Sequence, residues 1–183
     1  MLAEKCKVAV FVSGGGTNLQ AILDSRGEII KNAEVCLVAS SSKDAYALER
    51  AKKHDIETFI IEDEQRLVEK LKSLEIDFIV LAGYLRILSE EFCKRYSNRI
   101  INVHPSLIPS FCGKGFYGLK VHEKALEYGV KVSGATVHFV NEIPDGGKII
   151  DQKAVRVHEG DTAEDLQKRV MAEAEHIILP QAV

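Results

Sequence analysis

Short apolar segments alternate with helical patterns along most of this chain, and that alternation constrains the fold more than any other feature. The apolar segments that we expect to form strands are residues 7–13, 35–39, 58–61, 78–82 and 100–104. Helical patterns lie between them, at residues 19–23, 45–54, 67–74 and 90–96. Strands that alternate with helices are typical of an open parallel sheet with helices on both faces. Residues 78–82 are apolar at every position, which predicts a central strand.

The pattern changes after residue 104. A loop rich in proline and glycine, residues 105–118, precedes a short helix at 122–128. Two more strands are expected at 134–140 and 148–157, joined by Pro-Asp-Gly-Gly at 144–147, a sequence that favours a turn. A last helix is expected from about residue 162 to 179, with Thr162 and Asp165 as a loose capping box. We therefore predict an α/β fold: an open, mostly parallel twisted sheet with an antiparallel hairpin after the fifth strand.

Length and charge limit the class of protein. With 183 residues the chain is expected to be a single domain. Its 24 basic and 27 acidic residues give a net charge of −3, which offers no general reason to bind nucleic acid or anionic membranes. No segment approaches the ~20 apolar residues of a membrane span, and the start does not resemble a secretory signal. We predict a soluble protein without nucleic-acid or membrane partners, and the oligomeric state stays open.

The cysteines point to a reducing compartment. Cys6, Cys36, Cys93 and Cys112 are far apart and form no CxxC pair, so neither a zinc site nor a disulfide framework is indicated. The histidines other than His104 show no spacing typical of metal ligands: His54, His122, His138, His158 and His176. We predict a cytoplasmic protein with no metal.

A glycine-rich loop, Ser-Gly-Gly-Gly-Thr-Asn at residues 13–18, directly follows the first expected strand. Glycines allow the backbone to approach a ligand closely, and the helix that follows presents unpaired N–H groups to an anion. The spacing matches neither a dinucleotide fingerprint nor a P-loop, which favours a phosphomonoester. Thr17 or Asn18 is expected to cap the helix. The alternative is a tight turn that binds nothing.

A polar cluster is expected where the fifth strand ends. Asn102 and His104 share one face of that strand, and an amide beside an imidazole can stabilise a developing oxyanion. Asp145 lies in the predicted hairpin turn, and near His104 its carboxylate would raise the imidazole pKa toward neutrality or above. The alternatives are a structural histidine and an ordinary turn residue. Arg86, just after the fourth strand, could face an anionic substrate, while Glu175 alone resembles a solvated acid.

Five motifs together resemble the phosphoribosylglycinamide formyltransferase family, the folate-dependent transformylases of purine synthesis. They are Val-Ser-Gly-Gly-Gly-Thr-Asn-Leu-Gln at 12–20, Val-Leu-Ala-Gly-Tyr-Leu-Arg-Ile-Leu at 80–88, Ile-Asn-Val-His-Pro-Ser-Leu-Ile-Pro at 101–109, Gly-Ala-Thr-Val-His-Phe-Val at 134–140 and Asp-Gly-Gly at 145–147. The resemblance covers nearly the whole chain. It implies a Rossmann-like formyltransferase fold over residues 1–183, with a phosphate-binding half (1–104) and a folate and catalytic-loop half (105–183).

The resemblance also implies a reaction and a set of site residues. The formyl group of 10-formyltetrahydrofolate, a cosubstrate, would pass to the amine of 5-phosphoribosylglycinamide. The catalytic residues would be Asn102, His104 and Asp145. The phosphate and ribose would contact Gly16, Thr17, Asn18 and Glu175. The folate pocket would be formed by Leu85, Arg86, Ile87, Leu88, Asn102, Asn141, Glu142, Ile143, Pro144 and Asp145, with Arg66 added from the segment before the fourth strand.

Two alternatives remain open from the sequence. A 10-formyltetrahydrofolate deformylase would transfer the formyl group to water, but the glycine loop favours a phosphorylated acceptor. A non-catalytic nucleotide-binding module would explain the sheet and the loop, but it would leave Asn102, His104 and Asp145 without a role.

Overall fold

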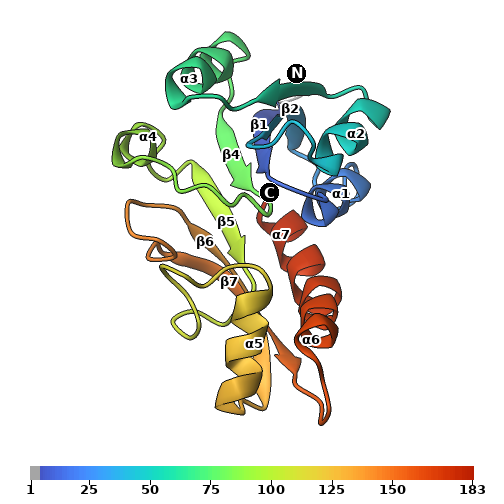
Figure 1. Cartoon of the computed structure of the whole chain (residues 1–183). Helices are drawn as coiled ribbons and strands as arrows, with labels where there is room; N and C mark the ends of the chain where they lie inside the picture. The colour runs from blue at the N-terminus through green and yellow to red at the C-terminus, as the bar shows by residue number, and fades with distance from the viewer. Residues whose placement is uncertain (1–4) are drawn as a thin grey trace.

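The computed structural model describes residues 5–183, and its strands form one seven-stranded sheet in the order β3-β2-β1-β4-β5-β6-β7 (Figure 1). The strands are β1 (Cys6–Val12), β2 (Ala33–Ser40), β3 (Glu57–Ile60), β4 (Phe78–Leu81), β5 (Ile100–His104), β6 (Val132–Phe139) and β7 (Ile149–Arg156). All pairs from β3 to β5 are parallel, whereas β6 is antiparallel to both β5 and β7. The predicted fold class is therefore confirmed. The division into two halves at residue 104 stays a prediction. Residues 1–4 of the predicted first half lie outside the described residues.

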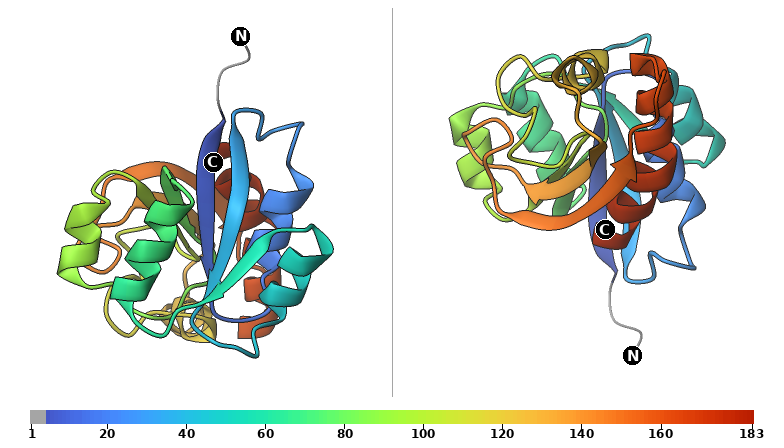
Figure 2. Two further views of the ribbon diagram at one scale, coloured as in Figure 1. Left: turned by 90° about the horizontal axis from the view of Figure 1, so that it is seen from above. Right: turned by 90° about the horizontal axis from the view of Figure 1, so that it is seen from below.

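Helices cover both faces of the sheet (Figure 2). They are α1 (Thr17–Asp24), α2 (Tyr46–Lys53), α3 (Glu64–Ser73), α4 (Glu90–Arg95), α5 (Leu119–Tyr128), α6 (Ala163–Val170) and α7 (His176–Ala182). Side chains alternate along each strand, so β1 contributes Val8 and Val10 to one core and Ala9 and Phe11 to the other. The first core is closed by α1, α2, α5, α6 and α7, and the second by α3 and α4.

The last helix differs from the prediction of one continuous helix. A π-helical segment, η1 (Met171–Glu175), separates α6 from α7. The predicted capping box is present, because Thr162 Oγ1 accepts from the Asp165 backbone N–H and Asp165 Oδ2 accepts from that of Thr162. Short π segments often occur at functional sites. This one has Met171 and Glu175 against the start of α1.

The start of α1 also differs from the prediction. Its N-cap is Gly16, with φ of 73°, so Thr17 and Asn18 lie inside the helix and make no cap. Their side chains instead contact the last helix. Similarly, α5 begins at Leu119 rather than at the predicted residue 122. Within residues 5–183 no helix is long and apolar enough to cross a membrane.

The sheet order determines where a site can form. Strands β1, β4 and β5 are neighbours and run parallel, so the segments that follow them emerge at one edge of the sheet. The glycine loop, the segment that contains Arg86 and the end of β5 at His104 meet there.

Candidate active site

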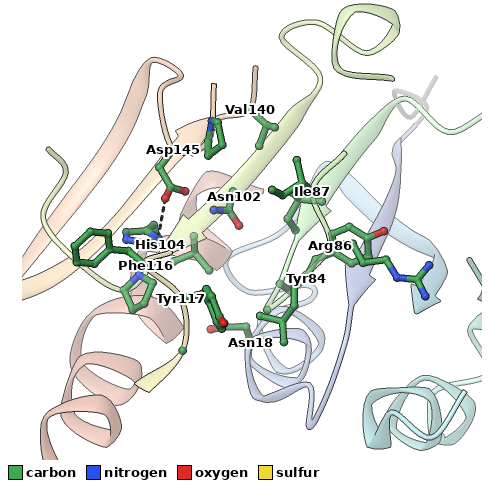
Figure 3. A pocket seen from close by; sticks show the side chains of 18 of the residues that line it. Asn18, Tyr84, Arg86, Ile87, Asn102, His104, Phe116, Tyr117, Val140 and Asp145 are labelled. Atoms are coloured by element: carbon green, nitrogen blue, oxygen red, sulfur yellow. Dashed lines mark ion pairs between the residues drawn. The ribbon is translucent and has the colours of Figure 1, made fainter. Parts of the chain in front are cut away.

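A cavity of about 690 Å³ opens at this edge of the sheet (Figure 3). Most of its lining comes from six parts of the chain: the glycine loop, the segment after β4, the end of β5, the loop before α5, the β6–β7 connection and the last helix. The volume lies within the ~300–1,000 Å³ of typical small-molecule sites. Of the predicted site residues, every one except Arg66 lines the cavity.

His104 and Asp145 meet inside the cavity. His104 Nδ1 lies 3.4 Å from Asp145 Oδ2, a contact that Figure 3 marks with a dashed line. Asp145 has φ of 55° in the turn that connects β6 with β7. On the other side of the ring, His104 Nε2 lies 2.9 Å from the carbonyl oxygen of Phe111. A carbonyl oxygen can only accept, so Nε2 carries a hydrogen.

A second imidazole, His138, completes the cluster. Its Nδ1 lies 2.8 Å from the Phe139 carbonyl oxygen and therefore carries a hydrogen. Its Nε2 lies 3.3 Å from Nδ2 of Asn102, which can only donate, and 3.6 Å from Asp145 Oδ1. The contact orients the amide of Asn102, with one Nδ2 hydrogen directed at His138.

Sequence analysis predicts no role for His138, although its position in the β5–β6 pair could have indicated one. His138 pairs with Asn102 in the antiparallel β5–β6 register. Alternation along β6 also puts His138 on the same face as Thr136. Those positions point to the site only once the register between the two strands is known.

The charges of the cluster follow from its burial. Burial lowers the pKa of His104, and the Asp145 carboxylate and the Phe111 carbonyl raise it by less. Burial acts to raise the pKa of Asp145, but its contacts with His138 and His104 and the hydrogen bond from the Gly113 N–H, 2.8 Å away, together lower it. At neutral pH the carboxylate is therefore ionised, whereas the lowered pKa of His104 disfavours its charged imidazole. The carboxylate acts on His104 in the predicted direction, but burial outweighs it, so the pKa is not raised to neutrality.

The glycine loop and the last helix form another part of the cavity wall. Asn18 Nδ2 donates to Glu175 Oε2 at 2.7 Å, and the Thr17 hydroxyl donates to Met171 Sδ at 3.2 Å. Glu175 is buried, and burial raises its pKa more than the hydrogen bond from Asn18 lowers it. Asn18 Oδ1 is also buried and has no hydrogen-bond partner in the described part of the chain. Glu175 thus lines the cavity as a buried carboxyl group and is not the solvated acid that its sequence context suggested.

Apolar side chains line another stretch of the wall. Leu85, Ile87 and Ile143 are 64%, 76% and 59% exposed, and all three line this one cavity. The guanidinium of Arg86 donates to the carbonyl oxygens of Ser41 and Ile61, each at 3.0 Å, and points away from His104 in Figure 3. The structure does not bring Arg66 to the cavity, because that side chain pairs with Glu62 at the start of α3.

His122 is a third imidazole in the cavity wall and had no predicted role. It lies on α5, is fully buried, and neither ring nitrogen has a hydrogen-bond partner among the described residues. Burial, with a smaller effect from His104, lowers the pKa of His122 to about 4. Residues 5–183 contain no group of three or more histidine, cysteine, aspartate or glutamate side chains arranged to hold a metal ion.

Comparison with known proteins connects this geometry to a family. The family model described as formyl transferase matches residues 6–183. The phosphoribosylglycinamide formyltransferase of Haemophilus influenzae is 39% identical over 188 residues, which are 97% of this chain and 85% of that protein. The chloroplastic phosphoribosylglycinamide formyltransferase of Arabidopsis thaliana is 41% identical over 187 residues, 97% of this chain. This chain spans 64% of the length of the Arabidopsis protein and 59% of its Vigna unguiculata counterpart.

Solved structures agree in fold and in sequence. The glycinamide ribonucleotide transformylase 1 of Symbiobacterium toebii superposes with a TM-score of 0.89 and 42% identity, covering 98% of this chain and 86% of that one. The phosphoribosylglycinamide formyltransferase of Anaplasma phagocytophilum superposes with a TM-score of 0.90 and 36% identity, covering 97% and 84%.

Proposed function

This chain belongs to the formyl transferase family, among the phosphoribosylglycinamide formyltransferases, and we propose that it transfers a formyl group from 10-formyltetrahydrofolate to the amine of 5-phosphoribosylglycinamide in purine biosynthesis. One observation carries the proposal. A single cavity holds Asn102, His104 and Asp145 together with the glycine loop and an exposed apolar wall. Such a cavity offers sites for a phosphorylated acceptor and an aromatic donor beside the same catalytic cluster.

The acceptor would bind at the glycine loop. Gly16, Thr17 and Asn18 form the start of α1, where unpaired N–H groups and the helix dipole favour a phosphate. Glu175, held by Asn18, would accept hydrogen bonds from the ribose hydroxyls. Bound in this way, the acceptor would have its glycinamide amine directed toward His104.

The donor would bind along the apolar wall. Leu85, Ile87 and Ile143 offer apolar surface for the folate rings, and Arg86, Leu88, Asn141, Glu142 and Pro144 line the same region. The guanidinium of Arg86 has donors beyond the two used by Ser41 and Ile61, and we propose that they serve the glutamate tail. Arg66 has no part in this proposal.

The cluster would act on the formyl group in three ways. Asn102, through its second Nδ2 hydrogen, and His104, through Nε2–H, would donate to the formyl oxygen as the amine nitrogen bonds to the formyl carbon. Asp145 would hold the His104 ring and, through water, carry the proton of the attacking amine to the folate nitrogen as its bond to the formyl carbon breaks. For this, Nε2–H of His104 must exchange the Phe111 carbonyl for the substrate oxygen.

The proposal includes a location and a set of partners. All four cysteines are free, which supports a reducing compartment such as the cytoplasm. The partners would be the two small-molecule substrates.

An absorbance assay with 10-formyltetrahydrofolate tests the proposal, run with and without 5-phosphoribosylglycinamide. We expect tetrahydrofolate to be released only when the acceptor is present. Release that does not depend on the acceptor would identify a deformylase. Absence of release under both conditions would contradict the proposal and favour a binding module.

A further inference from the structure

Helix α2 determines which way the glycine loop faces. Gly14 O accepts from the Ala47 backbone N–H at 3.1 Å, and Gly15 O accepts from Arg50 Nε at 2.8 Å. Ala47 and Arg50 do not line the cavity, whereas Gly14, Gly15 and Gly16 do. The carbonyl oxygens of Gly14 and Gly15 are thus held on the side of the loop away from the cavity.

The direction of these two carbonyls determines the direction of the next N–H groups. Among the described residues only the Ile108–Pro109 bond is cis, so both peptide bonds are trans. In a trans peptide the C=O and the following N–H point in opposite directions. The N–H groups of Gly15 and Gly16 therefore point away from α2 and toward the cavity, where they can donate to an anion.

The contact between α2 and the loop is close. A Cβ added to Gly16 would lie 2.6 Å from Ala47 Cβ, and Ala47 is fully buried. Gly16 also has φ of 73°, which favours glycine. Because Gly16 has no side chain and Ala47 has a small one, the loop lies close enough to α2 to accept these hydrogen bonds.

Arg50 is also a fixed positive charge behind the loop. Its Nη1 donates to Gln20 Oε1 at 2.9 Å, and its guanidinium lies over the ring of Tyr46, 5.1 Å from the centroid. Among the described residues that line the cavity, the lysines and arginines are Lys114 and Arg86, and neither belongs to the loop or to the last helix. Arg50 therefore supplies a positive charge that the glycine-loop part of the wall itself lacks.

We infer that Arg50 is a positioning residue for phosphate recognition, which it supports without touching the ligand. It holds the Gly15 carbonyl outward, so that the Gly16 N–H faces the phosphate, and its charge stabilises the bound dianion from behind. The inference rests on the proposed function, since that function supplies the phosphorylated acceptor.

Calorimetric titration with ribose 5-phosphate tests this role in the full chain. The variants are Arg50→Met, which removes the donors and the charge, and Arg50→Lys, which keeps the charge but not the planar pair of donors. Arg26→Met is the matched control. Arg26 donates from Nε to Leu23 O at 3.0 Å, and its Nη2 lies 2.8 Å from His54 Nδ1, so it links the ends of α1 and α2 away from the loop.

We expect the Kd for ribose 5-phosphate to rise about tenfold in Arg50→Met, less in Arg50→Lys, and to stay within about twofold of wild type in Arg26→Met. In the transfer assay, the KM for the acceptor should rise in Arg50→Met, while kcat and the donor KM stay near the wild-type values. Wild-type Kd in Arg50→Met, or equal losses in Arg50→Met and Arg26→Met, would overturn the inference and leave the proposed function intact. A wild-type protein that does not bind ribose 5-phosphate would overturn the inference, and absence of acceptor-dependent release in the transfer assay would overturn the proposed function.

Discussion

Among single residues, Asp145 connects the catalytic cluster. One carboxylate oxygen contacts His104 and accepts from the Gly113 N–H, and the other faces His138. His138 in turn holds the amide of Asn102. The orientation of both proposed oxyanion donors therefore depends, directly or through one neighbour, on a carboxylate that burial alone would tend to neutralise.

Replacing His104 with alanine tests the proposed role of its Nε2–H. We expect kcat to fall on the order of 10²–10³-fold, because a donor to the developing oxyanion is lost. The KM values should change far less, since the glycine loop and the apolar wall stay in place. Steady-state kinetics would measure this, with circular dichroism as a check of folding and the exposed His158→Ala as the control. Undiminished transfer by His104→Ala would disprove the assignment.

Among the cavity residues, the sequence alone indicates those that lie at the end of a recognisable strand. Asn102 and His104 end a strand that is apolar and easily recognised, and the cavity includes both. His138 and His122 could not be assigned in this way. The role of His138 depends on the antiparallel register between β5 and β6, and that of His122 on how α5 packs beneath the loop. Glu175 was identified only by resemblance, because nothing local predicts that Asn18 binds it.

Among the elements, α6 depends on the capping box that its sequence predicts. We expect Thr162→Ala to lower the free energy of unfolding by about 1 kcal/mol, because the Asp165 N–H loses its acceptor. Urea denaturation would measure the change. Thr162→Ser keeps a hydroxyl and should retain most of the stability, so an equal loss in both variants would show that the cap contributes little.

The π segment η1 is the part of the last helix that the sequence could not predict. Periodicity predicts that residues 162–179 form a helix, and they do, but it cannot indicate a five-residue π segment within it. Its first and last residues, Met171 and Glu175, contact Thr17 and Asn18, at the other end of the chain. Thr17 and Asn18 do not cap α1, because Gly16 is its N-cap and both residues lie inside the helix. In contrast, the five parallel strands and the hairpin are recognisable because their apolar segments are short and bounded by turn residues.

For the whole molecule, buried histidines make stability depend on pH. Burial lowers the pKa values of His104, His122 and His176. The unfolded chain then binds more protons than the native one below a pH of about 6.5, so the unfolding free energy falls as the pH falls. His122 has a pKa of about 4 and is fully buried, so its contribution lowers the unfolding free energy by about 3 kcal/mol between pH 6.5 and pH 4.

The variant His122→Phe tests this contribution, because it removes one buried titrating group. We expect its unfolding free energy to fall less steeply than that of wild type as the pH is lowered from 6.5 to 4, even if its stability at pH 7.5 differs. Urea titrations at several pH values would measure the slopes. The exposed His158→Asn is the control for the removal of a histidine from the surface. Parallel curves for wild type and His122→Phe would exclude His122 as a source of the acid sensitivity.

The place of β4 in the middle of the sheet matters while the chain is being synthesised. When β4 leaves the ribosome it can pair with β1, but β5, its other neighbour, begins only at Ile100. Until then β4 is an open edge, and its sequence Phe-Ile-Val-Leu has no charge or proline to discourage pairing with another chain. Translation adds about 5–20 residues per second, so the nascent chain keeps this edge for seconds. A chaperone that protects the nascent chain from aggregation would bind it at residues 78–81.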